Sequence, residues 1–170
     1  MERVLGGCRI RSWRAGDASS LSRHADNRKI WLNVRDHFPH PYTVADAERW
    51  IVLAAGATPE TQFAIEVDGE AAGGVGLFLR QDVERRGAEI GYWLGEAHWG
   101  RGLMTGIVRD FTAWAFGEFD LLRIFAVVFE WNPASCRVLE KAGYVLEGRL
   151  RRAVVKDGQV LDQLLYATVR

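Results

Sequence analysis

The stretch Ala88–Thr105, read as AEIGYWLGEAHWGRGLMT, decides the fold of this chain. Its first part, residues 88–94, is a short apolar run with two aromatic side chains, which is typical of a β-strand. From Leu103 onward, apolar side chains recur at helical spacing and predict a helix over residues 103–116. The sequence therefore predicts a strand that passes through a glycine-containing loop into a helix.

The loop between this strand and this helix has the composition of an anion-binding site. The first turn of a helix has backbone N–H groups without a helical partner, and the helix dipole makes this end partly positive. No Ser, Thr, Asp or Asn directly precedes Leu103 to cap these donors. Gly100 and Gly102 allow a pyrophosphate to approach the backbone, and Arg101 between them adds positive charge. A tight turn without a ligand has the same pattern, so both interpretations stay open at this point.

Residues 99–104, read as WGRGLM, resemble the acetyl-CoA loop of the GNAT N-acetyltransferase superfamily, which is usually written Q/R-x-x-G-x-G/A. More narrowly, residues 91–105, read as GYWLGEAHWGRGLMT, and residues 131–144, read as WNPASCRVLEKAGY, resemble the RimJ/RimL branch, whose members acetylate protein N-termini and related amines. Two positions depart from the superfamily pattern. Trp99 replaces the usual Gln or Arg, which is ordinary for this branch, and Met104 replaces a small residue and could crowd the pyrophosphate.

The resemblance implies an acetyl-CoA-dependent N-acetyltransferase without a metal. In this fold the strand at 88–94 and a later strand at 123–129 diverge, and acetyl-CoA enters the opening. Gly91 could host the bulge that separates them, although a glycine that only accommodates a neighbour fits equally well. The residues that we expect to bind acetyl-CoA are Tyr92, Trp93, Leu94, Gly100, Arg101, Gly102, Leu103, Met104, Thr105, Asn132 and Ser135.

The reaction that the resemblance implies is the attack of a neutral amine on a thioester carbonyl. It needs hydrogen-bond donors for the developing oxyanion, for which the backbone near Trp93 and Leu94 is our candidate. It also needs a catalytic proton acceptor, and Glu89 is the candidate because it shares a strand face with Gly91 and Trp93. A salt bridge or a surface position is the ordinary alternative for a carboxylate in an apolar strand.

The resemblance gives no direct match for the residue that donates a proton to the leaving thiolate. Many superfamily members use a tyrosine on the helix after the fifth strand, and the matching position here is Leu139, so that acid is missing. Ser135 matches the serine of the branch pattern NxxS and is our catalytic candidate for this role. We expect Asn132 and Ser135 to contact the pantetheine arm or the thiol, with helix capping by Asn132 as the alternative. Tyr144 is expected in the core.

Residues 31–42, read as WLNVRDHFPHPY, form an aromatic connection between two predicted helices. A packed connection is one interpretation. The equivalent connection lines the amine pocket in the superfamily, so the resemblance implies that Trp31, Phe38 and Tyr42 bind the substrate. His37 and His40 have no third ligand at a sensible spacing, and we therefore expect no metal site.

The remaining elements follow from periodicity and turn residues. We expect little structure in residues 1–8 and a helix that is capped by Asp17 and runs to about residue 29. Strands are predicted at 9–13, 63–67, 72–79, 121–129, 144–155 and 159–169, and further helices at 44–55, with Thr43 as its cap, and 132–142. Asp68-Gly69 predicts an antiparallel hairpin between the strands at 63–67 and 72–79, and the helix between the strands at 88–94 and 121–129 implies that these two run parallel. This order matches an α/β (α+β) GNAT fold, a mixed twisted sheet of about seven strands flanked by about four helices. We expect residues 1–170 to form a single GNAT domain.

Composition narrows the function classes further. Lys plus Arg and Asp plus Glu number 22 each, so no global field favours nucleic acid or an anionic membrane, in spite of seven tryptophans. No apolar run approaches the roughly 18 residues of a membrane span. The two cysteines form no CxxC pair, which fits a reducing compartment, and we expect a cytoplasmic transferase.

Three functions are compatible with these features of the sequence. The first is acetylation of a protein or peptide N-terminal α-amine, of the ribosomal-protein type, in a ternary complex. The second is a small-molecule acetyltransferase for an aminoglycoside or polyamine, which needs a denser acidic pocket than the dispersed carboxylates provide. The third is a non-catalytic acyl-CoA-binding module, which Met104 and the missing tyrosine favour. The sequence identifies neither the acceptor amine nor the length of the acyl group, and a homodimer is an expectation by analogy with the family.

Overall fold

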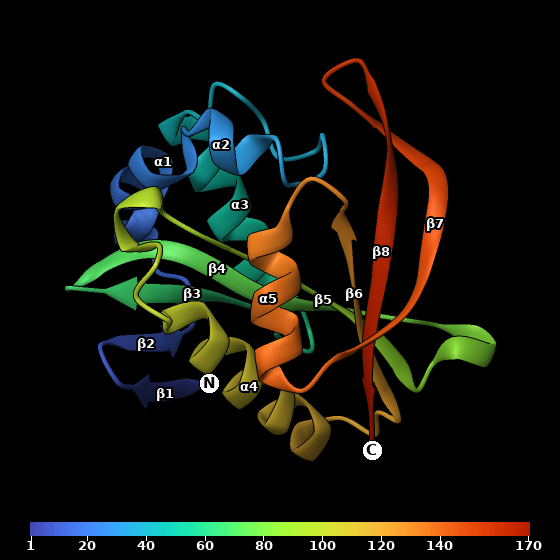
Figure 1. The fold of residues 1–170 in the computed structure, drawn as a ribbon. Coiled ribbons are helices and arrows are strands. Elements are labelled where there is room, and N and C mark those ends of the chain that lie inside the picture. Colours follow the sequence, from blue (N-terminus) through green and yellow to red (C-terminus); the bar gives the residue numbers. More distant parts are fainter. The chain divides into compact units, whose positions relative to one another are not determined.

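The computed structural model describes residues 1–170, and its strands and helices follow each other largely as the sequence predicts. Eight strands form a mixed sheet in the order β1-β2-β3-β4-β5-β6-β8-β7, and five helices flank it (Figure 1). The strands are Glu2–Leu5 (β1), Cys8–Arg11 (β2), Gln62–Val67 (β3), Glu70–Leu79 (β4), Gly87–Leu94 (β5), Arg123–Phe129 (β6), Val145–Lys156 (β7) and Gln159–Val169 (β8). The helices are Ala18–Ala25 (α1), Arg28–Trp31 (α2), Val44–Gly56 (α3), Leu103–Glu118 (α4) and Pro133–Ala142 (α5).

The chain divides into two compact units, which are described separately. The first unit comprises Met1–Gly76 and Gly91–Leu103, and the second comprises Leu77–Ile90 and Met104–Arg170. Strands β4 and β5 each contribute residues to both units. None of the helices is both long and apolar enough to cross a membrane.

In the first unit, β3 and β4 form the predicted antiparallel hairpin. Asp68 and Gly69 connect them with φ values of 52° and 85°, the left-handed conformation that a two-residue hairpin turn requires. The predicted cap of α3 is also confirmed, because the Thr43 hydroxyl accepts a hydrogen bond from the Asp46 N–H and the Asp46 carboxylate accepts one from Thr43. Apolar faces of α1 and α3 meet in a core that includes Leu21, Ala47 and Ile51.

Two predictions for the start of the chain are wrong. Residues 2–5 form β1, which pairs antiparallel with β2 at the edge of the sheet. Its exposed and half-buried residues alternate without a strong apolar pattern, so the sequence carries little signal for this edge strand. The helix predicted to run to about residue 29 is interrupted, because Asn27 is extended and its side chain accepts from the Lys29 N–H to begin the separate helix α2.

Asp17 does not cap α1 with its side chain, contrary to prediction. Its carboxylate accepts two hydrogen bonds from the guanidinium of Arg11, at 2.7 and 2.8 Å. Arg11 is only 3% exposed and also donates to Glu66 at 2.6 Å, so one buried cation joins β2, β3 and the turn before α1. A buried charge must be paired, and this pairing outweighs the capping preference of Asp17.

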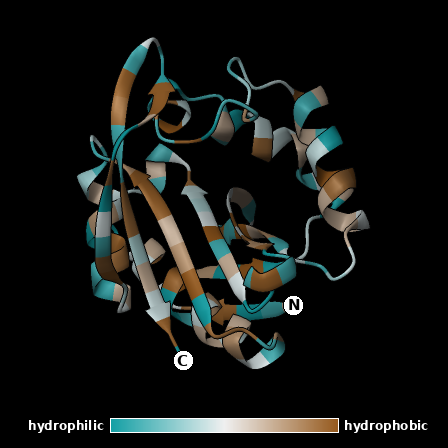
Figure 2. Cartoon of the chain, turned by 90° about the vertical axis from the view of Figure 1, so that its right-hand side faces the viewer, coloured by the Kyte–Doolittle hydropathy of each residue, from teal (hydrophilic) through white to brown (hydrophobic).

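In the second unit, β5 and β6 run parallel, and α4 is the helix that connects them along the chain, as predicted. Strand β6 also pairs antiparallel with β8, and β8 pairs with β7 in a long hairpin. Strand β6 begins at Arg123, two residues later than predicted, because residues 121 and 122 belong to the turn after α4. Figure 2 shows hydrophobic and hydrophilic residues alternating in bands along the strands and helices.

Helix α5 begins and ends as its sequence predicts. The Asn132 side chain accepts from the Ser135 N–H at 3.1 Å, Pro133 occupies the first helical position, and Gly143 ends the helix with a φ of 96°. Tyr144 follows and is 3% exposed, as expected for a core residue. Burial raises the pKa of Tyr144 to about 12, and its hydroxyl lies 2.7 Å from that of Thr112 on α4.

Candidate active site

The loop between β5 and α4 is built around two left-handed glycines. Gly100 and Gly102 have φ values of 73° and 74°, whereas Arg101 between them has no positive φ. Such an alternation turns successive backbone N–H groups toward one concave side, where an anion can bind. A Cβ atom built on either glycine would meet no atom within 4 Å, so the conformation and not crowding requires glycine. The backbone of the loop is therefore open on the side where these side chains would begin.

Trp99 braces the beginning of this loop. Its indole Nε1 donates a hydrogen bond of 2.7 Å to the carbonyl oxygen of Leu94, the last residue of β5. The side chain that departs from the superfamily pattern thus ties the loop to the strand before it. Trp99 is 45% exposed, so its ring also offers a free face to solvent.

The guanidinium of Arg101 lies in a polar cluster that the sequence did not indicate. Its Nη1 is 3.2 Å from Nδ1 of His98 and 3.8 Å from a carboxylate oxygen of Asp68, which belongs to the β3–β4 turn. The only sequence signal for His98 is its position three residues before Arg101. The cation that we expect at the phosphates is therefore held by neighbours from two segments of the first unit.

Trp93 is packed closely against β4. A Cβ at Gly74 would lie 3.0 Å from the indole Nε1 of Trp93, and one at Gly73 would lie 2.5 Å from its carbonyl oxygen. Phe38 contacts Trp93 edge-on, with ring centroids 5.6 Å apart, and lies 4.8 Å from the ring of Tyr42. One predicted substrate residue, Phe38, therefore contacts a predicted cofactor residue in the first unit, and a second, Tyr42, contacts Phe38.

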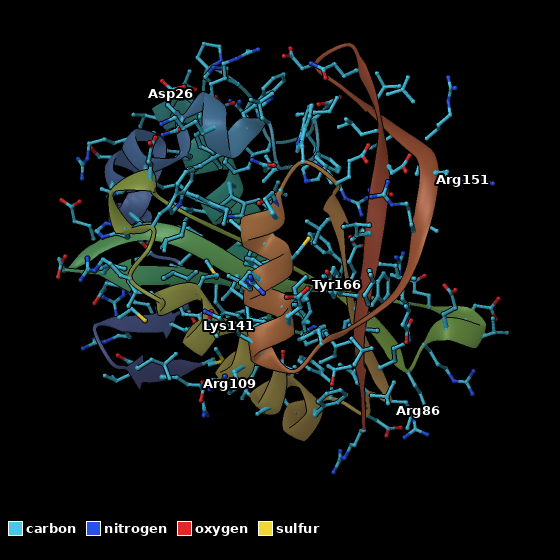
Figure 3. The ribbon with its side chains drawn as sticks, viewed as in Figure 1. Asp26, Arg86, Arg109, Lys141, Arg151 and Tyr166 are labelled. Carbon is cyan, nitrogen blue, oxygen red and sulfur yellow. The ribbon has the colours of Figure 1, made fainter.

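The three predicted substrate residues differ in their surroundings. Tyr42 is 7% exposed and burial raises its pKa to about 12, so most of its side chain belongs to the core. Trp31 is half-buried and stacks on His40 at 5.7 Å. Asp26 (Figure 3) fixes this connection, because it accepts a hydrogen bond from the Tyr42 N–H and lies 3.3 Å from His40. The packed-connection interpretation therefore holds for Tyr42, and binding of the substrate by Trp31, Phe38 and Tyr42 stays a prediction.

Glu89 lies in the second unit, at the last residue pair of the short parallel pairing between β5 and β6. The parallel pairing of β5 with β6 covers three residue pairs and ends where Glu89 pairs with Phe125, although β6 continues to Phe129. Glu89 is 9% exposed and accepts a hydrogen bond of 3.2 Å from Arg80, whose guanidinium stacks on the ring of Phe125. The salt-bridge alternative is therefore realised, and a catalytic use of the carboxylate stays a prediction.

The candidates on α5 are positioned by capping. Asn132 and Ser135 are both half-buried, and the capping alternative for Asn132 is realised. Leu139 has no exposed surface, so the position of the family's tyrosine is filled by a core residue. Tyr166 lies on β8 (Figure 3). Its hydroxyl donates to Glu140 at 3.2 Å, but burial raises the pKa of Tyr166, which makes this hydroxyl a poor acid.

The remaining predicted cofactor residues lie at or near this loop. Tyr92 is half-buried within β5, and Leu103, Met104 and Thr105 are half-buried in the first turn of α4. No group of three or more His, Cys, Asp or Glu side chains has a geometry that could hold a metal ion.

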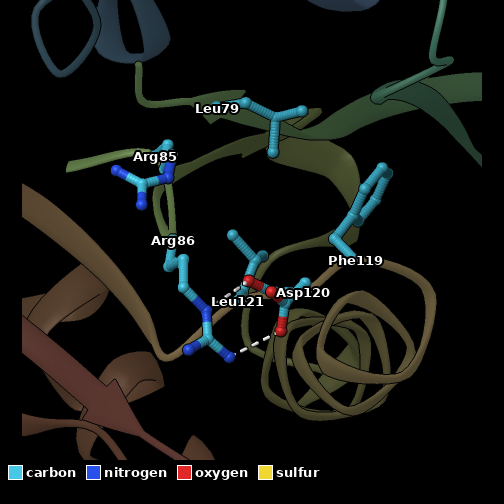
Figure 4. Close-up of a pocket in the computed structure, with 6 residues that line it drawn as sticks. All are labelled: Leu79, Arg85, Arg86, Phe119, Asp120 and Leu121. Atoms are coloured by element: carbon cyan, nitrogen blue, oxygen red, sulfur yellow. Dashed lines mark hydrogen bonds and ion pairs between the residues drawn. The ribbon is translucent and has the colours of Figure 1, made fainter. Parts of the chain in front are cut away.

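A surface pocket of the second unit involves none of the predicted site residues. It is lined by Leu79, Arg85, Arg86, Phe119, Asp120 and Leu121 (Figure 4). Arg86 donates to the Asp120 carboxylate at 2.5 Å and to the Asp120 carbonyl oxygen at 3.2 Å. Its charge is thus already neutralised within the pocket.

The fold and the loop define a class: mixed α/β proteins in which a strand passes through a nest of left-handed glycines into a helix. The acetyltransferase (GNAT) domain matches residues 8–145, and the chain belongs to this family.

Relatives and solved structures agree with this family. The ribosomal-protein-serine acetyltransferase of Escherichia coli is 32% identical over 56% of this chain and 54% of its own length. The spermidine N(1)-acetyltransferase of the same species is 30% identical over 59% of this chain and 53% of its own length. The chain therefore matches only about half of these curated relatives. The structure of Mycobacterium smegmatis RimJ in complex with CoA-disulfide has a TM-score of 0.85 at 29% identity, over 99% of this chain and 85% of RimJ.

Proposed function

We propose that this protein is an acetyl-CoA-dependent N-acetyltransferase of the RimJ/RimL type, which acetylates the α-amine of a protein or peptide N-terminus. The observation that carries the proposal is the open nest at Gly100 and Gly102, directly before the N-terminus of α4. The space where a side chain would begin at each glycine is open, and a left-handed loop before a helix N-terminus is an arrangement that binds phosphate groups. Family membership and the CoA-bound RimJ neighbour support the choice of cosubstrate.

Acetyl-CoA, when bound, supplies the activated acetyl group. In our proposal the loop from Gly100 to Thr105 and the Arg101 side chain hold the pyrophosphate. Asn132 and Ser135 contact the pantetheine arm or the thiol, and Ser135 is the proton donor for the leaving thiolate. Backbone N–H groups near Trp93 and Leu94 stabilise the oxyanion, and the packing of Trp93 between β4 and Phe38 supports this part because it keeps the backbone fixed.

Glu89 accepts the proton of the amine through water in this proposal. Its hydrogen bond with Arg80 supports a fixed orientation for the carboxylate. The demand on such a base is modest, since an α-amino group has a reference pKa of about 7.7–8.0 and lysine one of about 10.4. A useful fraction of an N-terminal amine is therefore neutral near pH 7, and weak general-base assistance suffices.

For the identity of the acceptor amine, the comparisons support two alternatives, a protein N-terminus and a polyamine. The two Escherichia coli relatives are nearly equally similar, and one is named for ribosomal protein and the other for spermidine. The wall that Phe38, Tyr42 and Trp93 form is aromatic, and Asp36 is the one carboxylate in residues 31–42. A polycation needs several convergent carboxylates, so this wall favours the N-terminus of a peptide.

One experiment separates the candidate functions. Calorimetric titration of the protein with acetyl-CoA is followed by assays of CoA release with N-terminal peptides, spermidine and an aminoglycoside. Binding with turnover on peptides is the expected result, and preferred turnover on spermidine would establish the polyamine function instead. Binding without turnover on any amine would leave an acyl-CoA-binding module, and absence of binding would contradict the assignment of the loop.

Three further expectations belong to the same proposal. We expect residues 1–170 to act as one domain, since β4 and β5 run through both compact units. We expect a cytoplasmic protein, because Cys8 and Cys136 are both free thiols and fit a reducing compartment. A homodimer is expected by analogy with the family, and sedimentation velocity would decide it.

A further inference from the structure

A cluster of titratable side chains lies beside the glycine loop in the first unit. We name it the histidine cluster: His24 on α1, His98 just before the loop, Asp68 and Glu70 at the β3–β4 turn, and Arg23 and Arg101. The rings of His24 and His98 are tilted, with their centroids 5.5 Å apart. No role in the proposed reaction uses these histidines.

The cluster forms a continuous chain of contacts. The Arg23 guanidinium donates to a Glu70 carboxylate oxygen at 2.5 Å, and Nε2 of His24 lies 3.3 Å from the same oxygen. At the other end, Nδ1 of His98 is 3.2 Å from Arg101. The pair of histidine rings therefore connects helix α1 to the cation of the loop.

The position of the cluster is determined by close packing. A Cβ at Gly95, directly after β5, would lie 2.6 Å from Nδ1 of His24 and 3.1 Å from the Ala72 carbonyl oxygen. The side chain of His24 is only 14% exposed. Because the backbone passes so close to this ring, His24 has little freedom to move away from His98.

The geometry of the contact between His98 and Arg101 fits a neutral His98 ring. A guanidinium has only donors, so Nδ1 of His98 must supply the lone pair and the ring must be neutral. Burial, the neighbouring His24 and Arg101 all lower the pKa of His98, in that order, whereas Asp68 and Glu70 oppose the shift. Protonation of His98 would place two donors face to face and release Arg101.

We propose that His98 takes up a proton when a phosphate-bearing cosubstrate binds at the glycine loop, and that the histidine cluster thereby couples CoA affinity to pH. The inference rests on the proposed function. His98 is a positioning residue here: when neutral it holds Arg101 beside Asp68, and when protonated it frees Arg101 for the pyrophosphate and adds a second positive charge. A bound anion raises the pKa of a nearby histidine, because opposite charge favours the protonated form.

The sign of the pH dependence follows from linkage. Binding that raises the pKa of His98 must become tighter as the pH falls through the interval between the bound-state and free-state values. A rise of about one unit corresponds to an about tenfold change in affinity across that interval. Above the bound-state pKa the affinity is independent of this proton, and below the free-state pKa it is again constant.

The test is calorimetric titration of the full chain with CoA in two buffers of different ionisation enthalpy, from about pH 5.5 to about pH 8, where histidines titrate. We expect net proton uptake on binding and a dissociation constant that increases with pH. The variant His98→Gln keeps an acceptor for Arg101 but cannot take up a proton, so it should bind CoA without uptake. His37→Gln changes an exposed histidine outside the cluster and should retain the uptake.

A second variant and two further ligands show whether the proton uptake belongs to His98 and depends on the phosphate groups of the ligand. His24→Gln removes the neighbouring ionisable ring that lowers the pKa of His98, and should move the uptake by His98 to higher pH. Dephospho-CoA retains the pyrophosphate but lacks the 3′-phosphate of CoA, which itself titrates near about pH 6, so with this ligand the uptake that disappears in His98→Gln belongs to His98. Pantetheine, which carries no phosphate, should give none. CoA binding without proton uptake in the unmodified protein would overturn the inference and leave the proposed function intact. Absence of CoA binding at every pH would instead contradict the proposed function.

Discussion

Gly100 and Gly102 contribute to the site through backbone conformation alone, because each has a left-handed φ and an open space where a side chain would begin. A substitution at either position should therefore affect ligand binding more than packing. At Gly73 or Gly95, by contrast, the missing side chain lets two segments pack, so a substitution there would also lower stability. A non-glycine residue in the left-handed region costs about 1–2 kcal/mol, and a β-branched residue tolerates it worst.

The variant Gly102→Val should lose most affinity for acetyl-CoA because it strains the nest and fills the space beside it. We expect the dissociation constant to rise by more than about tenfold, which corresponds to about 1.4 kcal/mol. The measurements are calorimetric titration and thermal unfolding, and the fold should survive. Gly106→Ala is the matched control, since Gly106 is a helical residue with equally open surroundings. Unchanged affinity in Gly102→Val would mean that the loop does not hold the cofactor.

The variant Glu89→Gln tests another single residue, the proposed proton acceptor. The amide preserves the shape of the side chain and can still accept from Arg80, but it cannot take a proton from the amine. We expect kcat on a peptide substrate to fall by about 10²-fold or more, with acetyl-CoA affinity nearly unchanged. Arg80→Met is the companion variant, because it removes the ion pair and keeps the carboxylate. A wild-type rate and pH profile in Glu89→Gln would exclude Glu89 from the mechanism.

At the scale of elements, the start of helix α5 matters for both folding and binding. Asn132 caps this helix and is also a residue of the candidate site. Asn132 caps the helix through its side chain, so a loss of function in a simple alanine variant would not distinguish a cap from a ligand contact. Substitution by Ala at such a cap costs about 1 kcal/mol, whereas Ser or Asp caps about as well as Asn.

Comparison of Asn132→Ala with Asn132→Ser resolves the two roles. Both variants should lose CoA affinity if Asn132 contacts the pantetheine arm, because neither retains the amide. Only Asn132→Ala should lose stability, by about 1 kcal/mol in urea unfolding. If Asn132→Ser binds CoA as tightly as the unmodified protein, the side chain is a cap only and the proposed contact is wrong.

Tyr144 and Thr112 join α4 to the segment after α5 through one buried hydrogen bond. The pKa of Tyr144 is raised to about 12, above the value of about 10 in an unfolded chain. As the pH rises from about 10 to about 12 the unfolded state loses this proton first, so the stability that Tyr144 contributes is complete below pH 10 and decreases above it.

Tyr144→Phe should therefore cost about 1 kcal/mol near pH 7 through the lost hydrogen bond. The difference from the unmodified protein should narrow in urea unfolding at about pH 11, because phenylalanine does not ionise. Thr112→Val is the control that removes the same bond but keeps the ionising group, so its difference should not narrow in that way. A constant difference for Tyr144→Phe across this range would contradict the raised pKa.

At the scale of the whole molecule, charge balance bears on the acceptor amine. The chain has 22 basic and 22 acidic residues, and the aromatic wall of the first unit contains no cluster of carboxylates. Long-range attraction of a polycation is therefore weak, and salt should have little to screen.

The expected result is a higher kcat/KM for N-terminal peptides than for spermidine, with less than about a twofold change for peptides between about 50 and 300 mM salt. Steady-state assays of CoA release at several salt concentrations check it. A spermidine rate that exceeds the peptide rate and decreases steeply with salt would indicate a polyamine enzyme.

Local signals explain which parts of the fold were predictable. The Asp68-Gly69 turn, the Thr43 cap and the α5 boundaries all depend on residues within about four positions of each other, so the sequence contains the whole cause. The use of Asp17 was not predictable, because Arg11 of the distant strand β2 binds its carboxylate. The split between α1 and α2 depends on Asn27, whose side-chain amide also donates a hydrogen bond to the distant Glu96. Strand β1 is defined by its partner β2 and not by its own pattern.

The candidate site divides in the same way. By itself the sequence determined the strand, the glycine loop, the helix behind it and the family, because a nest depends on the φ preferences of neighbouring residues. Only the tertiary structure decided that Glu89 pairs with Arg80, that Phe38 meets Trp93, and that two histidines 5.5 Å apart lie beside Arg101. These contacts join residues far apart along the chain, and burial together with charge pairing, which no local pattern encodes, selects them.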